Sequence, residues 1–526
     1  MKKITFTFFM SLVFILGHAQ APNIQWEKSL GGSGTDIAYC VRQTSDGGYI
    51  LVGETNSTDG DVTANNGTTD FWVAKLDANG ALQWQKALGG SGDDRGYSVA
   101  PTADGGYIVA GASNSTNGDV SGGKGLYDFW VVKLTSTGTI TWQKMLGGTG
   151  IDEARSVAQT TDGGYVVTGW IRSNNLDVTL NNGGSDYWIV KLDATGAITW
   201  QKSLGGTGDD TGNSIQQTAD GGYIVAGETI STNGDVTGNN GGTDYWVVKL
   251  NSTGTTIDWK KCYGGTGIDK AKSIHQTTDG GYIIAGTAAS TNGNITLNNG
   301  LENPWIVKVS ATGTIEWQKC FGGMFYDAAN SIQPTADGGY IFAGNVSSNN
   351  ADVSGNHGGD DIWVVKLNTT GTLQWQKCLG GTGSDIAFAV QQTTDNGYIL
   401  AGKSNSAAGD RTSPKGLVDF WAVKLVGVPT NTAGTGLNNL SFEENLLMFP
   451  NPSSGQLTIR NAGHPSLAEG FQIQLLNTLG EIVYDSDLQR EEISIYLSNR
   501  LVRGIYFVTI LDSQRNRMLT RKWIME

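Results

Sequence analysis

The sequence predicts an all-β fold: a seven-bladed β-propeller with four strands per blade, followed by a small C-terminal β-sandwich. Seven copies of one unit recur at steps of 58 or 59 residues. A fixed period of this length is the signature of a repeat architecture. The repeated landmarks are a first tryptophan (Trp26, Trp84, Trp142, Trp200, Trp259, Trp317, Trp375), a second tryptophan (Trp72, Trp130, Trp188, Trp246, Trp305, Trp363, Trp421) and a turn aspartate (Asp46, Asp104, Asp162, Asp220, Asp279, Asp337, Asp395).

Each repeat contains four short segments that are typical of strands. In the fourth copy we expect strands at Asn213 to Gln217, Tyr223 to Gly227 and Tyr245 to Leu250, and in the copy before it at Ile198 to Leu204. Asp, Asn and Gly clusters, which favour turns, bound every segment, and none has a helical period. Four strands repeated seven times indicate a propeller.

The two ends of the repeat region predict how the ring closes. The region begins with a lone fourth strand, Ile24 to Leu30, and its last copy stops after Trp421 to Leu425 without one. The N-terminal strand is therefore expected to complete the last blade, which leaves no exposed sheet edge. Long and regular loops, such as Glu228 to Asp244, place the working face at one end of this ring.

Residues 1–19 have the pattern of a secretory signal peptide. Lys2 and Lys3 precede an apolar run from Ile4 to Leu16 and a small-residue cleavage site that ends at Ala19. The run is too short to cross a bilayer, so we expect an exported chain without a transmembrane segment. The formal net charge of −14 disfavours nucleic acid as a partner.

The cysteines are predicted to be small buried residues. Cys262, Cys320 and Cys378 occupy one repeat position, and Cys40 stands where other copies have serine. Equivalent points on neighbouring blades are too far apart for a disulfide, which needs Cα atoms within about 7 Å.

Residues 23–425 resemble a known group of repeats. The segments LGGSGDDRGYSV, DGGYIVAG and DFWVVKL are similar to the SBBP-type β-propeller repeats of bacterial exported proteins. The segment Leu192 to Trp200 is also similar to the tryptophan-docking motif of quinoprotein propellers, which implies that Trp200 lies on an outermost strand and holds blades together. The motif is one residue shorter here, so no quinone site is implied.

Positions that differ between copies are the candidate binding residues. Features present in every blade, such as the series that begins with Asp36, are expected to serve the scaffold, whereas a single site must break the symmetry. The copies disagree near the expected channel mouth, at Tyr39, Tyr97, Arg155, Asn213, Lys272, Asn330 and Phe388. Aromatic rings beside Arg, Lys and Asn suit a glycan or a surface protein; the alternative is free variation of exposed positions.

A second loop series offers oxygen ligands. Asp61, Asp119 and Asp235 belong to it, each in an acidic, Asn- and Gly-rich stretch of the kind that calcium sites use. The stretch lacks the full spacing of an EF-hand loop or of a nonapeptide calcium repeat, so the leading interpretation is that these side chains bond the backbone of their own loop. We therefore expect no cofactor, with calcium as the alternative.

Catalytic motifs are lacking. His275, His357 and His464 fall in different repeats or domains, and no phosphate loop, zinc helix or nucleophile elbow is present. The leading hypothesis is a binding protein that is not an enzyme. The alternatives are a carbohydrate-active enzyme that uses loop carboxylates and a structural surface component without a ligand.

The sequence composition changes after the repeats. Residues 426–445 are predicted to be a linker, and residues 446–526 form short alternating strands typical of a small sandwich. This last segment resembles the C-terminal sorting domain of type IX secretion in Bacteroidetes-type bacteria. The residues that carry the resemblance are Pro450, Asn451, Pro452, Gly455, Gly504, Tyr506 and Lys522. It implies the type IX machinery as a partner and a protein that is attached to the cell surface or released.

Overall fold

The computed structural model describes residues 21–427, 446–449, 456–461, 471–477, 481–488, 492–496, 502–511 and 517–525. The predicted signal peptide and residues 428–445 of the predicted linker lie outside the described residues. The chain divides into two compact units, Met1–Val428 and Pro429–Glu526. Each is described by itself.

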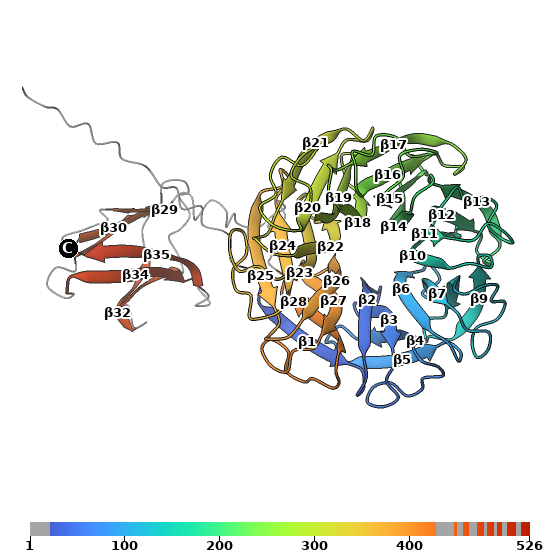
Figure 1. The fold of residues 1–526 in the computed structure, drawn as a ribbon. Helices are drawn as coiled ribbons and strands as arrows, with labels where there is room; N and C mark the ends of the chain where they lie inside the picture. The colour runs from blue at the N-terminus through green and yellow to red at the C-terminus, as the bar shows by residue number, and fades with distance from the viewer. Residues whose placement is uncertain are drawn as a thin grey trace, which may run out of the picture. The chain divides into compact units, whose positions relative to one another are not determined.

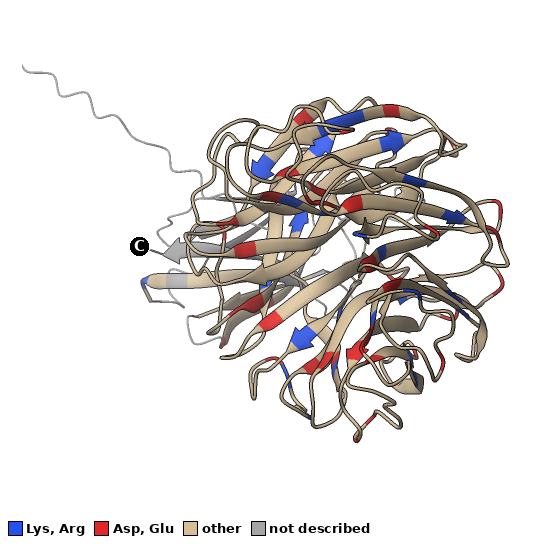
Figure 2. Ribbon diagram, turned by 45° about the vertical axis from the view of Figure 1, so that its right-hand side comes forward, with Lys and Arg blue, Asp and Glu red and all other residues tan. Residues whose placement is uncertain are grey.

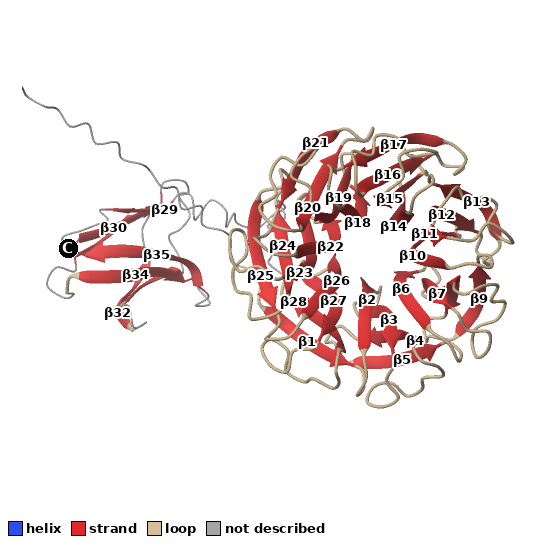
Figure 3. Ribbon diagram, in the orientation of Figure 1, coloured by secondary structure: helices blue, strands red, loops and turns tan. Residues whose placement is uncertain are grey.

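The first unit is a ring of seven four-stranded antiparallel sheets, which confirms the predicted propeller (Figure 1). Within each blade the first strand lies innermost and the fourth outermost, and loops join the strands throughout (Figure 3). The first strands are β2 (Asp36–Gln43), β6 (Asp94–Pro101), β10 (Asp152–Gln159), β14 (Asp210–Gln217), β18 (Asp269–Gln276), β22 (Asp327–Pro334) and β26 (Asp385–Gln392). The second strands are β3 (Tyr49–Thr55), β7 (Tyr107–Ser113), β11 (Tyr165–Ile171), β15 (Tyr223–Thr229), β19 (Tyr282–Ala288), β23 (Tyr340–Val346) and β27 (Tyr398–Ser404).

The outer two strands complete each blade. The third strands are β4 (Asp70–Leu76), β8 (Asp128–Leu134), β12 (Asp186–Leu192), β16 (Asp244–Leu250), β20 (Asn303–Val309), β24 (Asp361–Leu367) and β28 (Asp419–Leu425). The fourth strands are β5 (Leu82–Leu88), β9 (Ile140–Leu146), β13 (Ile198–Leu204), β17 (Ile257–Tyr263), β21 (Ile315–Cys320), β25 (Leu373–Leu379) and, for the last blade, β1 (Ile24–Leu30). The predicted first strands were too short by three residues, because the constant aspartate belongs to the strand and not to the loop before it.

The N-terminal strand closes the ring, as predicted. Strand β1 pairs antiparallel with β28, with Trp26 opposite Lys424 and Leu30 opposite Phe420. The last sheet therefore contains strands from both ends of the repeat region, in the order β1-β28-β27-β26. This pairing covers the backbone edge that β28 would otherwise expose.

The core lies between neighbouring blades. The second tryptophan of every repeat is fully buried. Its ring packs against the preceding blade; Trp246, for example, lies 4.5 Å from the ring of Tyr187 between centroids. The outer tryptophans also join blades: Trp142 donates from Nε1 to the carbonyl of Ala194 at 3.2 Å and packs against Tyr165. The role that the docking motif implied for the first tryptophan series is thus observed.

An ion pair between a buried lysine and a largely exposed aspartate anchors the turn between the first two strands of each blade. The ammonium of Lys133, on β8, is nearly inaccessible to solvent and lies 2.8 Å from the carboxylate of Asp104. Hydrogen bonds from Lys133 and the Thr102 hydroxyl lower the pKa of Asp104 to about 2. The same pair recurs in all seven blades. The turn aspartates thus serve the scaffold.

The second unit contains two antiparallel sheets. One has the order β29-β30-β33, with β29 (Leu446–Phe449), β30 (Gln456–Asn461) and β33 (Glu492–Tyr496). The other has the order β32-β31-β34-β35, with β31 (Phe471–Leu476), β32 (Ile482–Leu488), β34 (Gly504–Leu511) and β35 (Arg517–Met525). This agrees with the small sandwich predicted. No helix in the described part of the chain is long and apolar enough to cross a membrane.

Candidate functional site

The centre of the ring contains a cavity of about 320 Å³. Its lining includes all seven positions at which the repeats were seen to differ: Tyr39, Tyr97, Arg155, Asn213, Lys272, Asn330 and Phe388. All seven side chains are half-buried. Residues spread over six repeat lengths of sequence therefore meet around one opening, which makes this channel the candidate site.

A β-bulge places each of these side chains. In every blade the register between the first and second strands shifts at this position, so that Tyr39 is the extra residue between Ala38 and Cys40. The same shift occurs in the other six blades. Bulges redirect a side chain without breaking the sheet. The bulge is part of the scaffold, and only the side chain it carries varies.

Glycine on the second strand makes room for the bulge. A Cβ atom at Gly53 would lie 1.8 Å from the carbonyl oxygen of Ile37. A residue with a side chain would therefore collide with the bulged strand. This explains why each second strand has Gly as its fifth residue, from Gly53 to Gly402.

One side of the channel is aromatic. The ring of Tyr39 lies 5.2 Å from that of Tyr97 and 5.1 Å from that of Phe388. The Tyr39 hydroxyl donates to Glu54 Oε1 at 3.1 Å, and burial raises the pKa of Tyr39 well above its usual value. The phenol therefore stays protonated and fixed. The three rings form a continuous apolar surface at the channel wall.

The other side is polar and basic. The guanidinium of Arg155 stacks 4.3 Å above the ring of Tyr97 and pairs with Glu153 at 2.7 Å. Lys272 lies 3.6 Å from Glu228. Asn213 and Asn330 donate from their side-chain amides to carbonyls of the neighbouring first strands, at 2.8 and 2.9 Å. These contacts hold the polar side chains in position before any ligand arrives.

In five of the seven blades a serine hydroxyl lies directly behind the bulge. The Ser98 Oγ accepts a hydrogen bond from Val157 N at 3.2 Å, and Ser331 Oγ accepts one from Val390 N, also at 3.2 Å. These bonds run from one first strand to the next. The serines therefore stitch the inner strands together and keep the channel walls rigid.

One arginine and one histidine of the lining were not among the predicted binding residues. Arg42 and His275 occupy the same repeat position, three residues beyond the bulge, where other copies have Ala or Gln. His275 faces the cavity. Loss of hydration, with a contribution from the Arg42 charge, lowers the pKa of His275 to about 3. The signal was available, because this position also differs between copies.

The calcium candidates lie elsewhere, at the junctions between blades. Asp61 Oδ2 accepts a hydrogen bond from Gly31 N at 3.1 Å, and Asp119 and Asp235 accept equivalent bonds from Gly89 N and Gly205 N at 3.3 Å. These bonds fix the Gly-Gly segment that precedes the first strand of the same blade. They do not go to the backbone of the loop that contains the aspartate. Within the described residues no group of three or more His, Cys, Asp or Glu is arranged to hold a metal ion.

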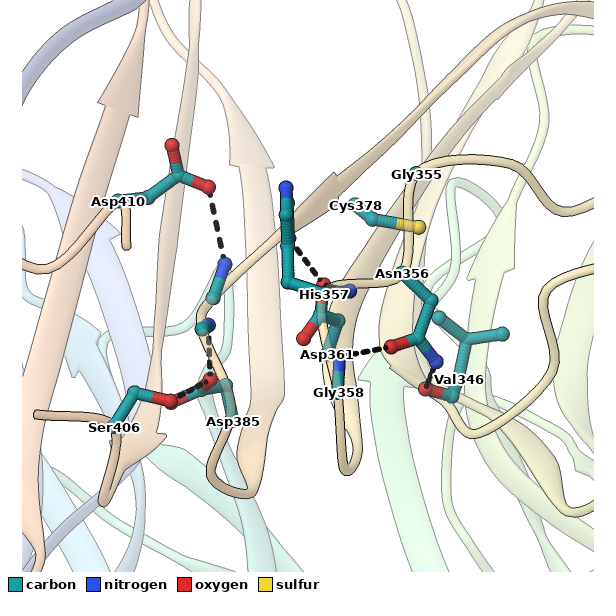
Figure 4. Close-up of polar contacts among 12 residues, drawn as sticks. Val346, Gly355, Asn356, His357, Gly358, Asp361, Cys378, Asp385, Ser406 and Asp410 are labelled. Atoms are coloured by element: carbon teal, nitrogen blue, oxygen red, sulfur yellow. Dashed lines mark hydrogen bonds and ion pairs between the residues drawn. The ribbon is translucent and has the colours of Figure 1, made fainter. Parts of the chain in front are cut away.

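Six of the seven junctions also contain two buried aspartates. Figure 4 shows the junction of the sixth and seventh blades, where Asp361 comes from β24 and Asp385 from β26. Asp385 Oδ2 accepts bonds from Ser406 Oγ at 2.6 Å and Gly381 N at 2.9 Å. Asp361 Oδ2 lies 2.7 Å from Nδ1 of His357. These carboxylates bind and position the loops that meet between the two blades.

The junctions differ in how their charge is balanced. Lys124 pairs with Asp177 at one junction, Lys415 pairs with Asp61 at another, and there Arg411 also pairs with Asp419. At the junction of the first two blades, Asp70 is fully buried and its Oδ1 has no hydrogen-bond partner. Burial, with a smaller contribution from the charges of Asp94 and Asp119, raises the pKa of Asp70 to about 6.

The cysteines are free, as predicted, but only two of the four are buried. Cys40 and Cys378 are buried, and Cys262 and Cys320 are half-buried. Burial raises the pKa of Cys262, Cys320 and Cys378 to about 12. Their thiols are therefore poor nucleophiles.

Two further departures from the repeat lie outside the channel lining. Phe325 and Tyr326 are 54% and 58% exposed on the passage into the sixth blade. The guanidinium of Arg172 lies 5.6 Å from the ring of Trp170. Neither pair belongs to the cavity.

In the second unit, the described sorting-motif residues lie on the four-stranded sheet. Gly504 and Tyr506 are in β34, and Lys522 is in β35. Tyr506 is buried and its hydroxyl donates to the carbonyl of Val502 at 2.7 Å. Pro450, Asn451, Pro452 and Gly455 lie outside the described residues.

Comparison with known proteins identifies the C-terminal segment. Residues 447–526 match the family described as the secretion system C-terminal sorting domain. This is the type IX sorting domain, as the motif residues predicted. The chain is accordingly exported to the cell surface or secreted, and its sorting domain engages the type IX secretion machinery.

The repeat region has weaker relatives. The chain is 25% identical over 375 residues to the regulatory protein FlaEY of Caulobacter vibrioides. The aligned region covers 62% of this chain and 38% of that protein. Similar solved structures include PorZ, a surface component of the type IX secretion system of Porphyromonas gingivalis (12% identity, TM-score 0.40, 94% of this chain and 60% of that one). A DUF4221 family member from Bacteroides vulgatus shares 11% identity at a TM-score of 0.33, over 77% of this chain and 97% of that one. The chain thus spans less than two thirds of the length of the first two relatives.

Proposed function

We propose that this exported protein is a binding protein whose propeller recognises a glycan at the mouth of its central channel. The observation that carries the proposal is that the backbone at the bulge is the same in every blade, whereas its side chain varies. Seven equivalent backbone positions are held in one geometry, yet they carry seven side chains chosen from Tyr, Arg, Asn, Lys and Phe. A scaffold role would favour one residue type in all copies.

The side chains suit a sugar. Aromatic rings pack against the apolar face of a pyranose, while amides and cations bond its hydroxyls. The channel offers both kinds of group within one cavity, because Tyr39, Tyr97 and Phe388 lie on one arc and Asn213, Lys272 and Asn330 on the rest. A volume of about 320 Å³ is near the lower end of the range for small-ligand sites, about 300–1000 Å³. The ligand is therefore a terminal unit or a short branch.

Binding is favoured over catalysis by the state of the nearby carboxylates. A glycosidase needs a pair of carboxyl groups facing the substrate. No carboxylate lines the cavity within the described chain, and Glu153 and Glu228 are each engaged by a cation.

The test is a glycan array probed with the full chain and with Tyr39→Ala and Phe388→Ala variants. We expect binding of the full chain to a subset of glycans and a loss of about tenfold or more in each variant, because both remove stacking surface. Phe325→Ala is the control, since it removes an exposed aromatic ring from outside the channel.

A Tyr39→Phe variant separates binding from folding. It keeps the ring and loses only the hydroxyl that donates to Glu54, so it should retain most of the affinity. The proposal fails if the full chain binds no glycan on a broad array. It fails equally if the channel variants bind as the full chain does while Phe325→Ala does not.

A further inference from the structure

The charges that line the channel are opposite in sign to the charge of the protein. The chain carries a formal net charge of −14, and acidic residues are spread over the blades (Figure 2). The cavity lining nevertheless includes Arg42, Arg155 and Lys272, and no Asp or Glu. In a strongly acidic molecule, a basic channel without carboxylates selects for negative ligands.

Two of the three cations are already paired. Arg155 contacts Glu153 at 2.7 Å, and Lys272 lies 3.6 Å from Glu228. Both pairs lie at the level of the bulge, where the aromatic rings are.

Arg42 differs from both. Its Nη1 donates to the carbonyl of Val41 at 2.8 Å, and no carboxylate in the described residues lies within ion-pair distance. The other groups at its level along the channel are neutral: His275, whose pKa is held at about 3, and Gln or Ala in the remaining copies. A half-buried guanidinium without a counter-charge keeps four N–H donors free for an anion.

We infer that the channel takes an anionic sugar, with its carboxylate or sulfate bound to Arg42 beyond the aromatic rim. The inference rests on the proposed function and names the class of glycan. Arg42 lies three residues further along β2 than Tyr39, so a sugar whose charged group is bound to Arg42 has its ring beside Tyr39, Tyr97 and Phe388. A guanidinium binds either anion through two parallel hydrogen bonds.

The test measures the affinity of the full chain for four probes by titration calorimetry. They are a galacturonic acid tetrasaccharide, its methyl ester, a sulfated galactose tetrasaccharide and the unsulfated neutral form. We expect at least one anionic probe to bind about tenfold or more tightly than its neutral partner, because a charge-assisted pair is lost in the latter. The uronic and sulfated arms identify which anion is bound.

Arg42→Gln should reduce binding of the anionic probe by about tenfold or more and weaken binding of the neutral probe far less. The control is Arg172→Gln, which changes the net charge equally but lies outside the channel lining. Raising the salt concentration should weaken anion binding to the unmodified chain, a result that requires no variant to fold.

The outcomes separate the two claims. Neutral and anionic probes that bind equally well, or anionic affinity unchanged in Arg42→Gln, overturn the inference and leave glycan binding intact. Binding of neither form, together with an empty glycan array, overturns the proposed function and the inference with it.

Discussion

Replacing Asp70 by Asn is expected to stabilise the propeller at high pH and to leave it almost unchanged at low pH. Asp70 Oδ2 accepts a bond from Asn66 N at 2.8 Å, but Oδ1 is buried without a partner, near the charges of Asp94 and Asp119. The fifth blade already carries the neutral residue: Asn303 donates to Asn298 Oδ1 at 2.9 Å and to the carbonyl of Gly323 at 3.3 Å.

The magnitude follows from the pKa of Asp70, which is raised from 3.8 to about 6. A raised pKa favours the folded state fully only below the pKa of the unfolded chain, and this contribution is lost as the pH rises through the pKa of the folded state. At pH 8 the ionised carboxylate costs about 3 kcal/mol, and at pH 4 only about 0.5 kcal/mol. For about 400 ordered residues, 3 kcal/mol corresponds to about 3–4 °C in Tm.

The assay is thermal unfolding followed by circular dichroism, at pH 4 and pH 8, for the full chain and Asp70→Asn. The matched control is Asp419→Asn. Its carboxylate pairs with Arg411 and both side chains are buried, so the variant leaves a buried cation unpaired and should lose about 3–5 kcal/mol. The reasoning is refuted if Asp70→Asn lowers the Tm at pH 8, or if it raises the Tm equally at both pH values.

Four other outcomes follow from the structure. Deleting residues 21–30 removes β1 and exposes the edge of β28, so size-exclusion chromatography should show association or aggregation; an unchanged monomer would contradict ring closure by this strand. Trp188→Ala removes a fully buried ring and should cost about 3–5 kcal/mol in chemical denaturation, whereas a loss below 1 kcal/mol would argue against its place in the core. Lys133→Met should lower the free energy of unfolding by no more than about 1 kcal/mol at neutral pH, because the Asp104 carboxylate is largely solvated. Since the pKa of Asp104 is low, this difference between the variant and the unmodified chain should vanish as the pH falls toward 2. A difference that does not depend on pH would indicate that Lys133 acts through packing instead. Deleting residues 447–526 removes the sorting domain, so cell fractionation should find the propeller retained inside the outer membrane, and continued export would disprove the role of this segment.

Several features of the fold were readable from the chain because they repeat. The tryptophan and aspartate periods indicated the blades, and the lone strand at Ile24 to Leu30 indicated the closure, which the pairing of β1 with β28 bears out. The motif from Gly504 to Lys522 indicated the sorting domain. Such features depend on local strand and turn residues, and these residues recur in each copy of the repeat.

Other features cannot be recognised in the sequence of a single repeat. The bulge arises from the fit of Gly53 against the carbonyl of Ile37, a contact between strands that spacing along the chain does not display. Arg42 was overlooked because its position is apolar or amidic in most copies, so its charge looked incidental. The cations at the junctions, such as Arg411, come from loops whose path only the folded chain defines.

By itself, the sequence determined the architecture, the exported character and the list of positions where the copies differ. The tertiary structure decided which of these positions meet. Tyr39 and Phe388 lie at opposite ends of the repeat region, yet their rings are 5.1 Å apart, because closure of the ring by β1 brings the first blade against the seventh. A channel exists only when the circle is complete, so the chemistry of its lining belongs to the assembled ring and not to any one repeat.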